Sequence, residues 1–227
     1  MPWDFEPPIS EFDPSAVAPP FYDWKLTYPF LRKLIELLPE IQEEVLSKTA
    51  ANPNSSEWFA WPELSLYKPQ EGHSWKVVPF LHTFPGDQPS QSEWIARSCE
   101  LFPKTSSILR EIPGIRTALL SRMGPQTSLT SHTGWAQLSN HVLRCHLPLL
   151  VPAEKTCGMI CENIIEWHSI GDILVFDDSK IHSAFNNSME KERIILLFDI
   201  ARPSSLAKGT AKGSTTEELQ GFIDYFK

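Results

Sequence analysis

The 227-residue chain lacks three features that would place it in a class at once. It has no run of about 20 apolar residues, so the sequence predicts no transmembrane helix. Residues 1–8 have neither the basic nor the apolar segment of a signal peptide, so we expect a cytoplasmic protein. No block concentrates Lys and Arg, and the formal net charge is −8. A nucleic-acid partner is therefore not expected, because neutralising phosphates requires a basic face.

Cysteine is also scarce, with four residues in the chain: Cys99, Cys145, Cys157 and Cys161. They are too few to form the framework of a disulfide-rich fold of this size. On an extended strand Cys157 and Cys161 would lie roughly 13 Å apart, so a bridge between them would need a turn. We expect buried thiols, and a disulfide between these two residues is the alternative. No second closely spaced pair suggests a zinc site.

The hydrophobic residues that are present, 41% of the chain with 11% aromatic, are enough to bury the core of a single domain. Proline is concentrated in residues 1–25, which predicts an irregular N-terminal arm on the surface. The aromatic side chains of this arm should dock it: Trp3, Phe5, Phe12, Phe21, Tyr22 and Trp24. Residues 26–227 are expected to form one catalytic domain.

The predicted secondary structure changes along this domain, from mostly helices to mostly short strands. In the predicted helical part, 26–114, apolar residues recur at three and four between Phe30 and Ser47, with Pro39 as a break, while 75–81 reads as a strand. Ser90 or Ser92 could cap a helix that ends at Leu101, and a further helix is expected over 105–112. Short strands dominate the core, 115–203, and are expected at 117–122, 142–151, 164–167, 172–176 and 193–201. A closing helix is expected in 214–227, so the fold class is mostly β, an antiparallel double-sheet barrel with helices packed outside.

Two histidines stand out against this background. His132 is followed by Thr133 and Gly134, and His182 lies on a later segment. Two imidazoles from separate strands can hold a transition metal. In an open iron site the carboxylate ligand usually comes two residues after the first histidine, and here that position is Gly134. Taken alone, two hydrogen-bonded polar histidines are the simpler interpretation of this pair.

Arginines on predicted strands add to the pattern. Arg144 and His146 are two residues apart, so they share one strand face, with apolar neighbours on the other. A charged group directed into a barrel needs a pairing partner or a ligand, and a structural ion pair is the alternative here. Arg193 begins the apolar run 194–198 and is suited to bind a carboxylate with both guanidinium nitrogens.

In this order, the elements resemble the aspartyl/asparaginyl β-hydroxylase family of Fe(II)/2-oxoglutarate-dependent oxygenases. The resemblance covers roughly residues 115–203 and is carried by His132-Thr133-Gly134, Arg144-x-His146, the run 173–179 ending in Asp177-Asp178-Ser179, His182 and Arg193. It implies a double-stranded β-helix (jelly-roll or cupin-like barrel). It also implies an iron centre with two histidines and no carboxylate, which agrees with Gly134.

The resemblance assigns roles to particular residues. His132 and His182 would be the metal ligands and catalytic centre. Arg193, assisted by Ser121, would bind the distal carboxylate of 2-oxoglutarate. The match of Ser121-Arg122-Met123 to the family's Ser-x-Met suggests that Met123 lines the same pocket.

By the same resemblance, Arg144 and His146 would contact the carboxylate of 2-oxoglutarate that lies near the metal. Asp177 and Asp178, shortly before His182, are more typical of a turn cap or of a group that orients a ligand than of a third metal ligand. The interval from His132 to Arg144 is about three residues longer than the family pattern, so residues 135–140 should differ at the mouth of the site. The membrane anchor and helical-repeat region of the animal enzymes have no counterpart, which favours a soluble substrate.

The expected activity is a dioxygenase that uses Fe(II), 2-oxoglutarate and O2 to hydroxylate an unactivated carbon. The β-carbon of an aspartyl, asparaginyl or related amino-acid group is the expected target, on a small-molecule, carrier-bound or peptidyl substrate. A tailoring oxygenase or halogenase is one alternative, because the coordination position left vacant at Gly134 could admit chloride. A non-catalytic barrel that binds iron or 2-oxoglutarate is the other.

Overall fold

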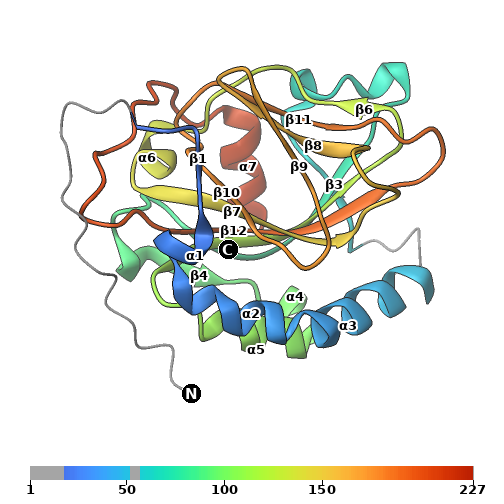
Figure 1. The fold of residues 1–227 in the computed structure, drawn as a ribbon, viewed down its shortest axis with the longest axis horizontal. Helices are drawn as coiled ribbons and strands as arrows, with labels where there is room; N and C mark the ends of the chain where they lie inside the picture. The colour runs from blue at the N-terminus through green and yellow to red at the C-terminus, as the bar shows by residue number, and fades with distance from the viewer. Residues whose placement is uncertain (1–17, 52–56, 227) are drawn as a thin grey trace.

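Two antiparallel sheets form the body of the protein in the computed structural model, which describes residues 18–51 and 57–226 (Figure 1). Eight strands form the major sheet: β1 (Phe21–Tyr22), β10 (Leu174–Phe176), β7 (Val142–Leu150), β12 (Arg193–Ala201), β5 (Ile115–Met123), β3 (Trp75–Thr83) and β2 (Phe59–Ala60) in this order, with β4 (Ser92–Trp94) paired to β3. Four strands form the minor sheet: β6 (Thr127–Ser128), β11 (His182–Asn186), β8 (Cys157–Cys161) and β9 (Ile164–Trp167). The double-stranded β-helix is confirmed.

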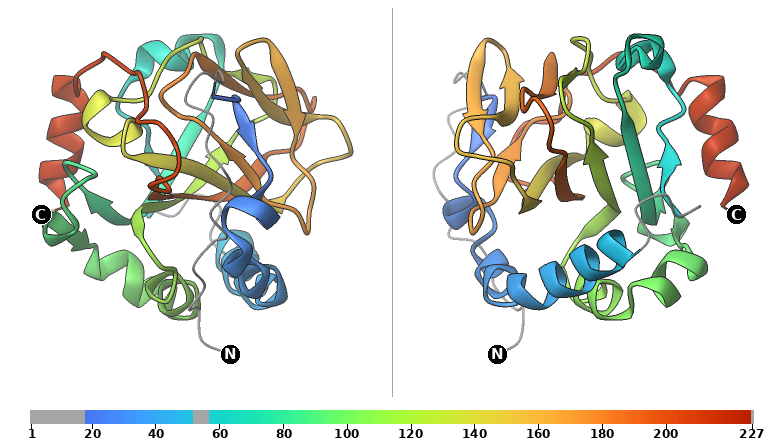
Figure 2. Two further views of the ribbon diagram at one scale, coloured as in Figure 1. Left: turned by 60° about the vertical axis from the view of Figure 1, so that its left-hand side comes forward. Right: turned by 90° about the vertical axis from the view of Figure 1, so that its right-hand side faces the viewer.

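Helices cover the outer face of the major sheet (Figure 2). Those of the N-terminal half are α1 (Trp24–Thr27), α2 (Arg32–Glu36), α3 (Leu38–Ala51), α4 (Ala96–Leu101) and α5 (Pro103–Arg110). Helix α6 (Ala136–Ser139) lies in the lengthened interval after His132, and α7 (Glu217–Tyr225) packs beside β2 at the edge of the major sheet. Short 3-10 turns complete the set: η1 (Pro29–Leu31), η2 (Leu64–Leu66), η3 (Pro69–Glu71) and η4 (Pro89–Gln91).

Side chains along the central strands point alternately to the two faces of the major sheet, so one face forms the core and the other forms the site. On β7, Leu143, Cys145 and Leu147 point outward and pack in the cluster beneath the helices. Arg144 and His146 therefore point to the inner face, toward the minor sheet. The same alternation on β12 buries its even-numbered residues under the helices and turns Arg193 inward. The inner face of the major sheet is thus where the polar groups gather.

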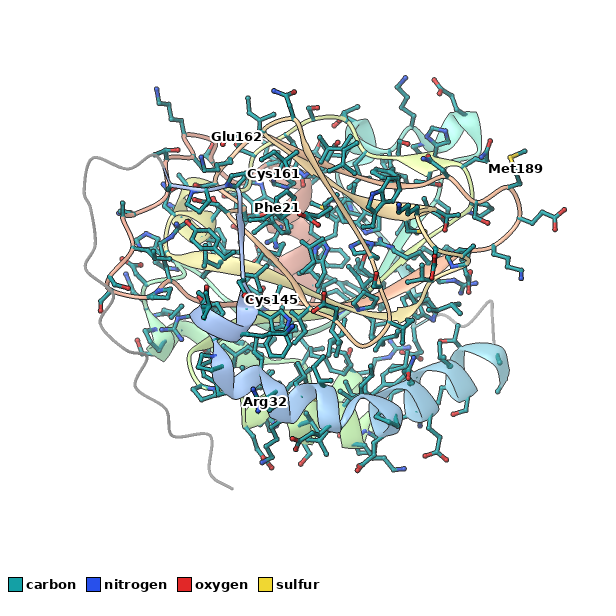
Figure 3. All side chains as sticks on the ribbon, in the orientation of Figure 1. Phe21, Arg32, Cys145, Cys161, Glu162 and Met189 are labelled. Atoms are coloured by element: carbon teal, nitrogen blue, oxygen red, sulfur yellow. The ribbon has the colours of Figure 1, made fainter. Side chains whose placement is uncertain are left out.

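The N-terminal arm docks as expected where the structure describes it. Phe21 and Tyr22 form β1 against β10, and the indole Nε1 of Trp24 donates to Asp172 Oδ1 at 2.7 Å. Phe21 also packs on the cluster between the sheets that includes Cys161, and Figure 3 shows the two residues close together. The expected docking of Trp3, Phe5 and Phe12 concerns residues outside the described ranges.

One expectation about the helical part needs correction. The helix placed after Ser90 or Ser92 begins only at Ala96, because Ser92–Trp94 pairs with the edge of β3 as β4. The Oγ atoms of Thr83 and Ser92 lie 2.7 Å apart across this pair, so tertiary pairing outweighs the local capping signal. The short strands β8 and β11 of the minor sheet were not anticipated. The break near Pro39 is confirmed, since α2 ends at Glu36 and α3 starts at Leu38.

All four cysteines are free thiols. Cys157 lies opposite Asn186 and Cys161 lies opposite His182, so the two residues sit at opposite ends of β8. Cys145 and Cys161, labelled in Figure 3, belong to different sheets. The alternative of a disulfide between Cys157 and Cys161 was therefore wrong. Within the described residues, no helix is both long and apolar enough to cross a membrane.

The layer between the helices and the major sheet should dominate stability. Phe198 on β12 is fully buried in this layer. We expect Phe198→Ala to lower the free energy of unfolding by about 3–5 kcal/mol, because the lost transfer energy and the cavity add. The exposed Leu26 is the matched control, and Leu26→Ala should change it by less than about 0.5 kcal/mol. Urea unfolding followed by circular dichroism measures both, and equal losses would contradict this layer as the main core.

Candidate active site

His132 and His182 face each other at the mouth between the two sheets. Their backbones form an isolated bridge, in which each amide donates to the carbonyl of the other residue, at 2.9 Å from His132 and 2.8 Å from His182. The ring centroids lie 4.4 Å apart. His132 follows β6 and His182 begins β11, so the two histidines paired in the sequence analysis are neighbours in space.

The ring nitrogens are oriented for metal binding. The Nδ1 of His132 lies 2.7 Å from the Thr130 carbonyl oxygen, and the Nδ1 of His182 lies 2.8 Å from that of Lys180. A carbonyl only accepts, so each Nδ1 carries the proton and each Nε2 keeps a free lone pair. Burial, with the neighbouring His132, lowers the pKa of His182 to about 3. A neutral imidazole with its Nδ1–H held by a backbone carbonyl is the arrangement common to metal-ligating histidines.

Asp178 occupies the space that a side chain at position 134 would fill. A Cβ built on Gly134 would lie 1.9 Å from Asp178 Oδ2, and the amide of Gly134 donates to the Asp178 carbonyl at 2.8 Å. Oδ1 of this carboxylate lies 3.4 Å from His182 Nε2, and its Oδ2 is buried with no hydrogen-bond partner. Only glycine therefore fits at position 134. The carboxylate beside the histidine pair comes from Asp178, four residues before His182, and not from the position two residues after His132.

Arg144 is held by two buried carboxylates. Its Nε and Nη2 donate to both oxygens of Asp199 at 2.8 and 3.0 Å, and its Nη1 donates to Asp178 Oδ1 at 2.5 Å. Burial alone would lower the pKa of Arg144, but the two acids outweigh it and raise the pKa above its ordinary value. The structural ion pair considered as an alternative is thus present. The guanidinium still lines the cavity, so its contact with 2-oxoglutarate stays a prediction.

Asp177 has a different role from its neighbour. Its Oδ1 accepts from the amide and the hydroxyl of Ser179 at 3.1 and 2.6 Å, and both of its oxygens accept from Arg202. The side chain therefore caps the turn that leads to His182, as the sequence indicated. Its carboxylate is fully used in doing so.

The residues assigned to the co-substrate line one cavity. Ser121, Met123, Arg144, His146 and Arg193 all border it, together with His132 and His182. Residues from β5, β7, β11 and β12 are brought together in this way, which is what their inward alternation requires. The structure therefore assembles every site residue proposed from the sequence around a single hollow.

Arg193 lies in this hollow without an acidic partner. It is 1% exposed, and its Nη2 donates to Ser121 Oγ at 3.3 Å. Its Nε is buried and makes no hydrogen bond, and no carboxylate pairs with it among residues 18–51 and 57–226. Burial lowers the pKa of Arg193 to about 10, so the group is still charged at neutral pH. A buried cation of this kind is a binding site for an anion.

A second, larger hollow opens on the other side of His132 and Gly134. Its wall is built from three stacked indoles, with Trp61 against Trp75 at 4.6 Å and against Trp135 at 6.1 Å between ring centroids. Helix α7 and the residue that caps it close the far side with apolar side chains: Leu219, Phe222, Ile223 and Phe226. The hollow reaches His132, so a molecule bound in it would lie next to one of the two paired histidines.

Sequence reasoning missed three residues of this centre. Asp199 shares the inner face of β12 with Arg193, and the period of two could have identified it as the partner of Arg144. Trp75 donates from its Nε1 to Ser121 Oγ at 3.0 Å, which orients the hydroxyl beside Arg193. His168 lies behind His146, and no spacing in the sequence signalled it.

The two free Nε2 atoms, the acid-free Arg193 and the unpaired Asp178 oxygen fit a divalent metal with an anionic co-substrate. A double-stranded β-helix with such a site belongs to the class of barrel-shaped metal-dependent oxygenases. The family model of aspartyl/asparaginyl β-hydroxylases matches residues 35–203. The chain belongs to this family.

Two curated relatives illustrate the range of the family. The ornithine lipid ester-linked acyl 2-hydroxylase of Rhizobium tropici is 30% identical over 187 residues, which cover 82% of this chain and 61% of that protein. The human aspartyl/asparaginyl β-hydroxylase is 33% identical over 111 residues, covering 47% of this chain and 14% of that protein. The chain thus spans less than two thirds of the length of these relatives.

Solved structures give weaker likenesses. An oxidoreductase of the 2OG-Fe(II) oxygenase family from Burkholderia pseudomallei matches with a TM-score of 0.46 at 12% identity, over 79% of this chain and 94% of that one. A Pseudomonas putida prolyl-4-hydroxylase has the same TM-score at 13% identity, over 74% and 87%. The fold assignment rests on the strand pairing described above.

The steric role of Gly134 is testable. Gly134→Ala should force its Cβ against Asp178 and lower the free energy of unfolding by about 1–3 kcal/mol. The same displacement should weaken Mn(II) binding, which calorimetry measures. Gly221→Ala on the exposed face of α7 meets no neighbouring atom and should stabilise by about 0.5–1 kcal/mol. Unchanged stability and metal affinity in Gly134→Ala would show that the contact with Asp178 is unimportant.

Proposed function

We propose that the protein is an Fe(II)/2-oxoglutarate-dependent dioxygenase that hydroxylates an unactivated carbon. One observation carries the proposal. A buried arginine without an acid and two imidazoles with free Nε2 atoms border the same cavity. A co-substrate that binds to a metal at one end and through a carboxylate at the other needs a metal site and an anion site side by side.

His132 and His182 would hold Fe(II), and 2-oxoglutarate would bind with its distal carboxylate on Arg193 and Ser121. Arg144 and His146 border the metal end of the cavity and would face the other carboxylate. Fe(II) and 2-oxoglutarate together activate O2 for C–H hydroxylation, with succinate and CO2 as the products of the co-substrate. Trp75 and the Ser121 hydroxyl would orient Arg193 for both oxygens of one carboxylate.

The other groups of the site would hold this arrangement in place. Arg144 is fixed by Asp199 and Asp178 in a low-dielectric interior, so it needs no reorganisation when the co-substrate binds. The free Oδ2 of Asp178 is an acceptor for a hydrogen bond at the metal end of the cavity. Gly134 would contribute no side chain to the metal end of the cavity, where Asp178 takes up the space beside it.

Family membership supports the β-carbon of an aspartyl, asparaginyl or related amino-acid group as the target.

The lining of the larger hollow favours a second candidate substrate, an acyl chain. Its wall is mostly aromatic and aliphatic, and its only lining arginine among the described residues, Arg144, is already held by two acids. The acyl 2-hydroxylase relative agrees with this second candidate.

The reaction and its alternatives separate in one experiment. Protein with Fe(II) and 2-oxoglutarate is exposed to O2, succinate is quantified, and candidate substrates are screened by mass: peptidyl and free aspartate and asparagine, carrier-bound amino acids, and acyl esters. A gain of one oxygen supports hydroxylation. Replacement of hydrogen by chlorine indicates a halogenase, and 2-oxoglutarate binding without substrate-stimulated succinate indicates a sensor.

Removal of a metal ligand should abolish turnover. His182→Ala is expected to lower succinate formation more than about a hundredfold, because even residues that merely support metal ligands are worth 10–100-fold. The control is His141→Ala: the Nδ1 of this ring lies 3.8 Å from Asp87 Oδ2 and the residue lines neither hollow, so the change should leave turnover unchanged. Circular dichroism should show both variants folded. Retained turnover in His182→Ala would remove this histidine from the metal centre.

Arg193 should determine co-substrate affinity. Arg193→Ala is expected to weaken 2-oxoglutarate binding by about 2–5 kcal/mol, at least about thirtyfold, since it removes one partner of a buried charge pair. Arg193→Lys should restore part of this, because an ammonium cannot bind both oxygens with a planar fork. Arg97→Ala, on the exposed surface, is the control. Calorimetry with Mn(II) in place of Fe(II) measures each dissociation constant, and parental affinity in Arg193→Ala would refute the assignment.

A further inference from the structure

A second imidazole lies directly behind His146. His146 Nδ1 and His168 Nε2 are 3.1 Å apart, and the two rings are 3% and 2% exposed. His168 follows β9, where its amide donates to the Cys157 carbonyl at 2.9 Å. His146 borders the co-substrate cavity, whereas His168 is one hydrogen bond further out and does not border it. Whatever His168 contributes to that cavity must therefore pass through His146.

The two rings form a chain with open ends. His146 Nε2 and His168 Nδ1 are buried, and neither has a hydrogen-bond partner among the described residues. Buried polar atoms of this kind are rare unless a ligand or water serves them. The Nε2 end lies in the cavity that also holds the unpaired Nε of Arg193. This end of the chain thus faces the place where a carboxylate is expected.

The hydrogen bond between the rings allows two arrangements of protons. Burial lowers the pKa of both His146 and His168 well below the ordinary value, and the charge of Arg193 lowers each further, so both rings are neutral. A neutral imidazole has one donor and one acceptor nitrogen. If His168 Nε2 donates to His146 Nδ1, then His146 Nε2 is a donor in the cavity. If the bond runs the other way, His146 presents a lone pair there.

Only the first arrangement suits an anion. A carboxylate accepts hydrogen bonds and is repelled by a lone pair, so it selects the form in which His146 Nε2 carries the proton. We propose that His168 is a positioning residue that holds His146 in this donor form, so that the cavity is preset for the co-substrate carboxylate. The proposal deepens the proposed function and rests on it.

Replacement by two side chains of equal length separates this role from packing. Glutamine can place its amide N–H where His168 Nε2 now donates, while methionine has the same shape and no donor. We expect His168→Met to weaken 2-oxoglutarate binding about tenfold, and His168→Gln to stay within about twofold of the parent. Calorimetry with the Mn(II)-loaded protein gives the dissociation constants. Thermal unfolding of the same variants without 2-oxoglutarate reports on packing.

A spectroscopic readout is independent of affinity. In the Zn(II)-loaded protein without 2-oxoglutarate, nitrogen NMR of the histidine rings distinguishes a protonated from an unprotonated ring nitrogen. We expect His146 Nε2 to be protonated in the parent and in His168→Gln. In His168→Met we expect a mixture of the two forms, because nothing then selects between them.

The outcomes distinguish the positioning role of His168 from the proposed function. The positioning role is supported if His168→Met binds 2-oxoglutarate more weakly than the parent while His168→Gln binds it with nearly the parental affinity. Equal affinity in both variants, or equal loss in both with a matching fall in thermal stability, overturns it and leaves the Arg193 site standing. A parent protein that does not bind 2-oxoglutarate at all would overturn the proposed function, and the inference with it.

Discussion

The ion-pair network of Arg144 connects the parts of the protein on which the site depends. It joins β7 to β12 through Asp199 and to the turn before β11 through Asp178, so one guanidinium links the major sheet to the strand of the second histidine. All three groups are buried, and removing one partner from such a network costs about 3–5 kcal/mol. The network also places the Asp178 carboxylate where a side chain at position 134 would stand, and this is why that position is glycine.

Arg193 stands in contrast to Arg144 a short distance away. Both guanidinium groups extend from the inner face of the same sheet, yet one is neutralised by protein acids and the other meets only a hydroxyl. The buried acids Asp178 and Asp199 thus pair with Arg144, which links the two sheets, and Arg193 is left to bind a ligand. His132 and His182 border the same cavity as both arginines, and the Nδ1 atoms of the two histidines are held by backbone carbonyls of nearby residues.

Much of this could be anticipated from local patterns. The long strands β5, β7 and β12 were expected at 117–122, 142–151 and 193–201, close to their observed bounds, and the period of two placed Arg144 and His146 on one face. The strands that the sequence analysis did not predict depend on contacts between residues distant in the chain. The edge strand β4 exists because β3 offers unpaired backbone groups, and no local signal records that. The strands β8 and β11 carry mixed polar and apolar residues whose pairing is set by the opposite strand.

The same distinction applies within the site. The family resemblance named seven residues, and the cavity brings all of them together. Asp199 follows from the period of two along β12 once Arg144 is known to need a partner. His168 does not follow from any period, because it leaves its strand at a loop and reaches His146 only through the packing of β9 against β8 and of β10 against β7.

The central claim is a metal held by two histidines with an anion on Arg193. A crystal structure with Mn(II) and 2-oxoglutarate tests it most directly. The account predicts His132 Nε2 and His182 Nε2 at about 2.1 Å from the metal, no protein carboxylate within about 2.3 Å, and one 2-oxoglutarate carboxylate on Arg193. Direct coordination of the metal by Asp178, or 2-oxoglutarate bound away from Arg193, would contradict it.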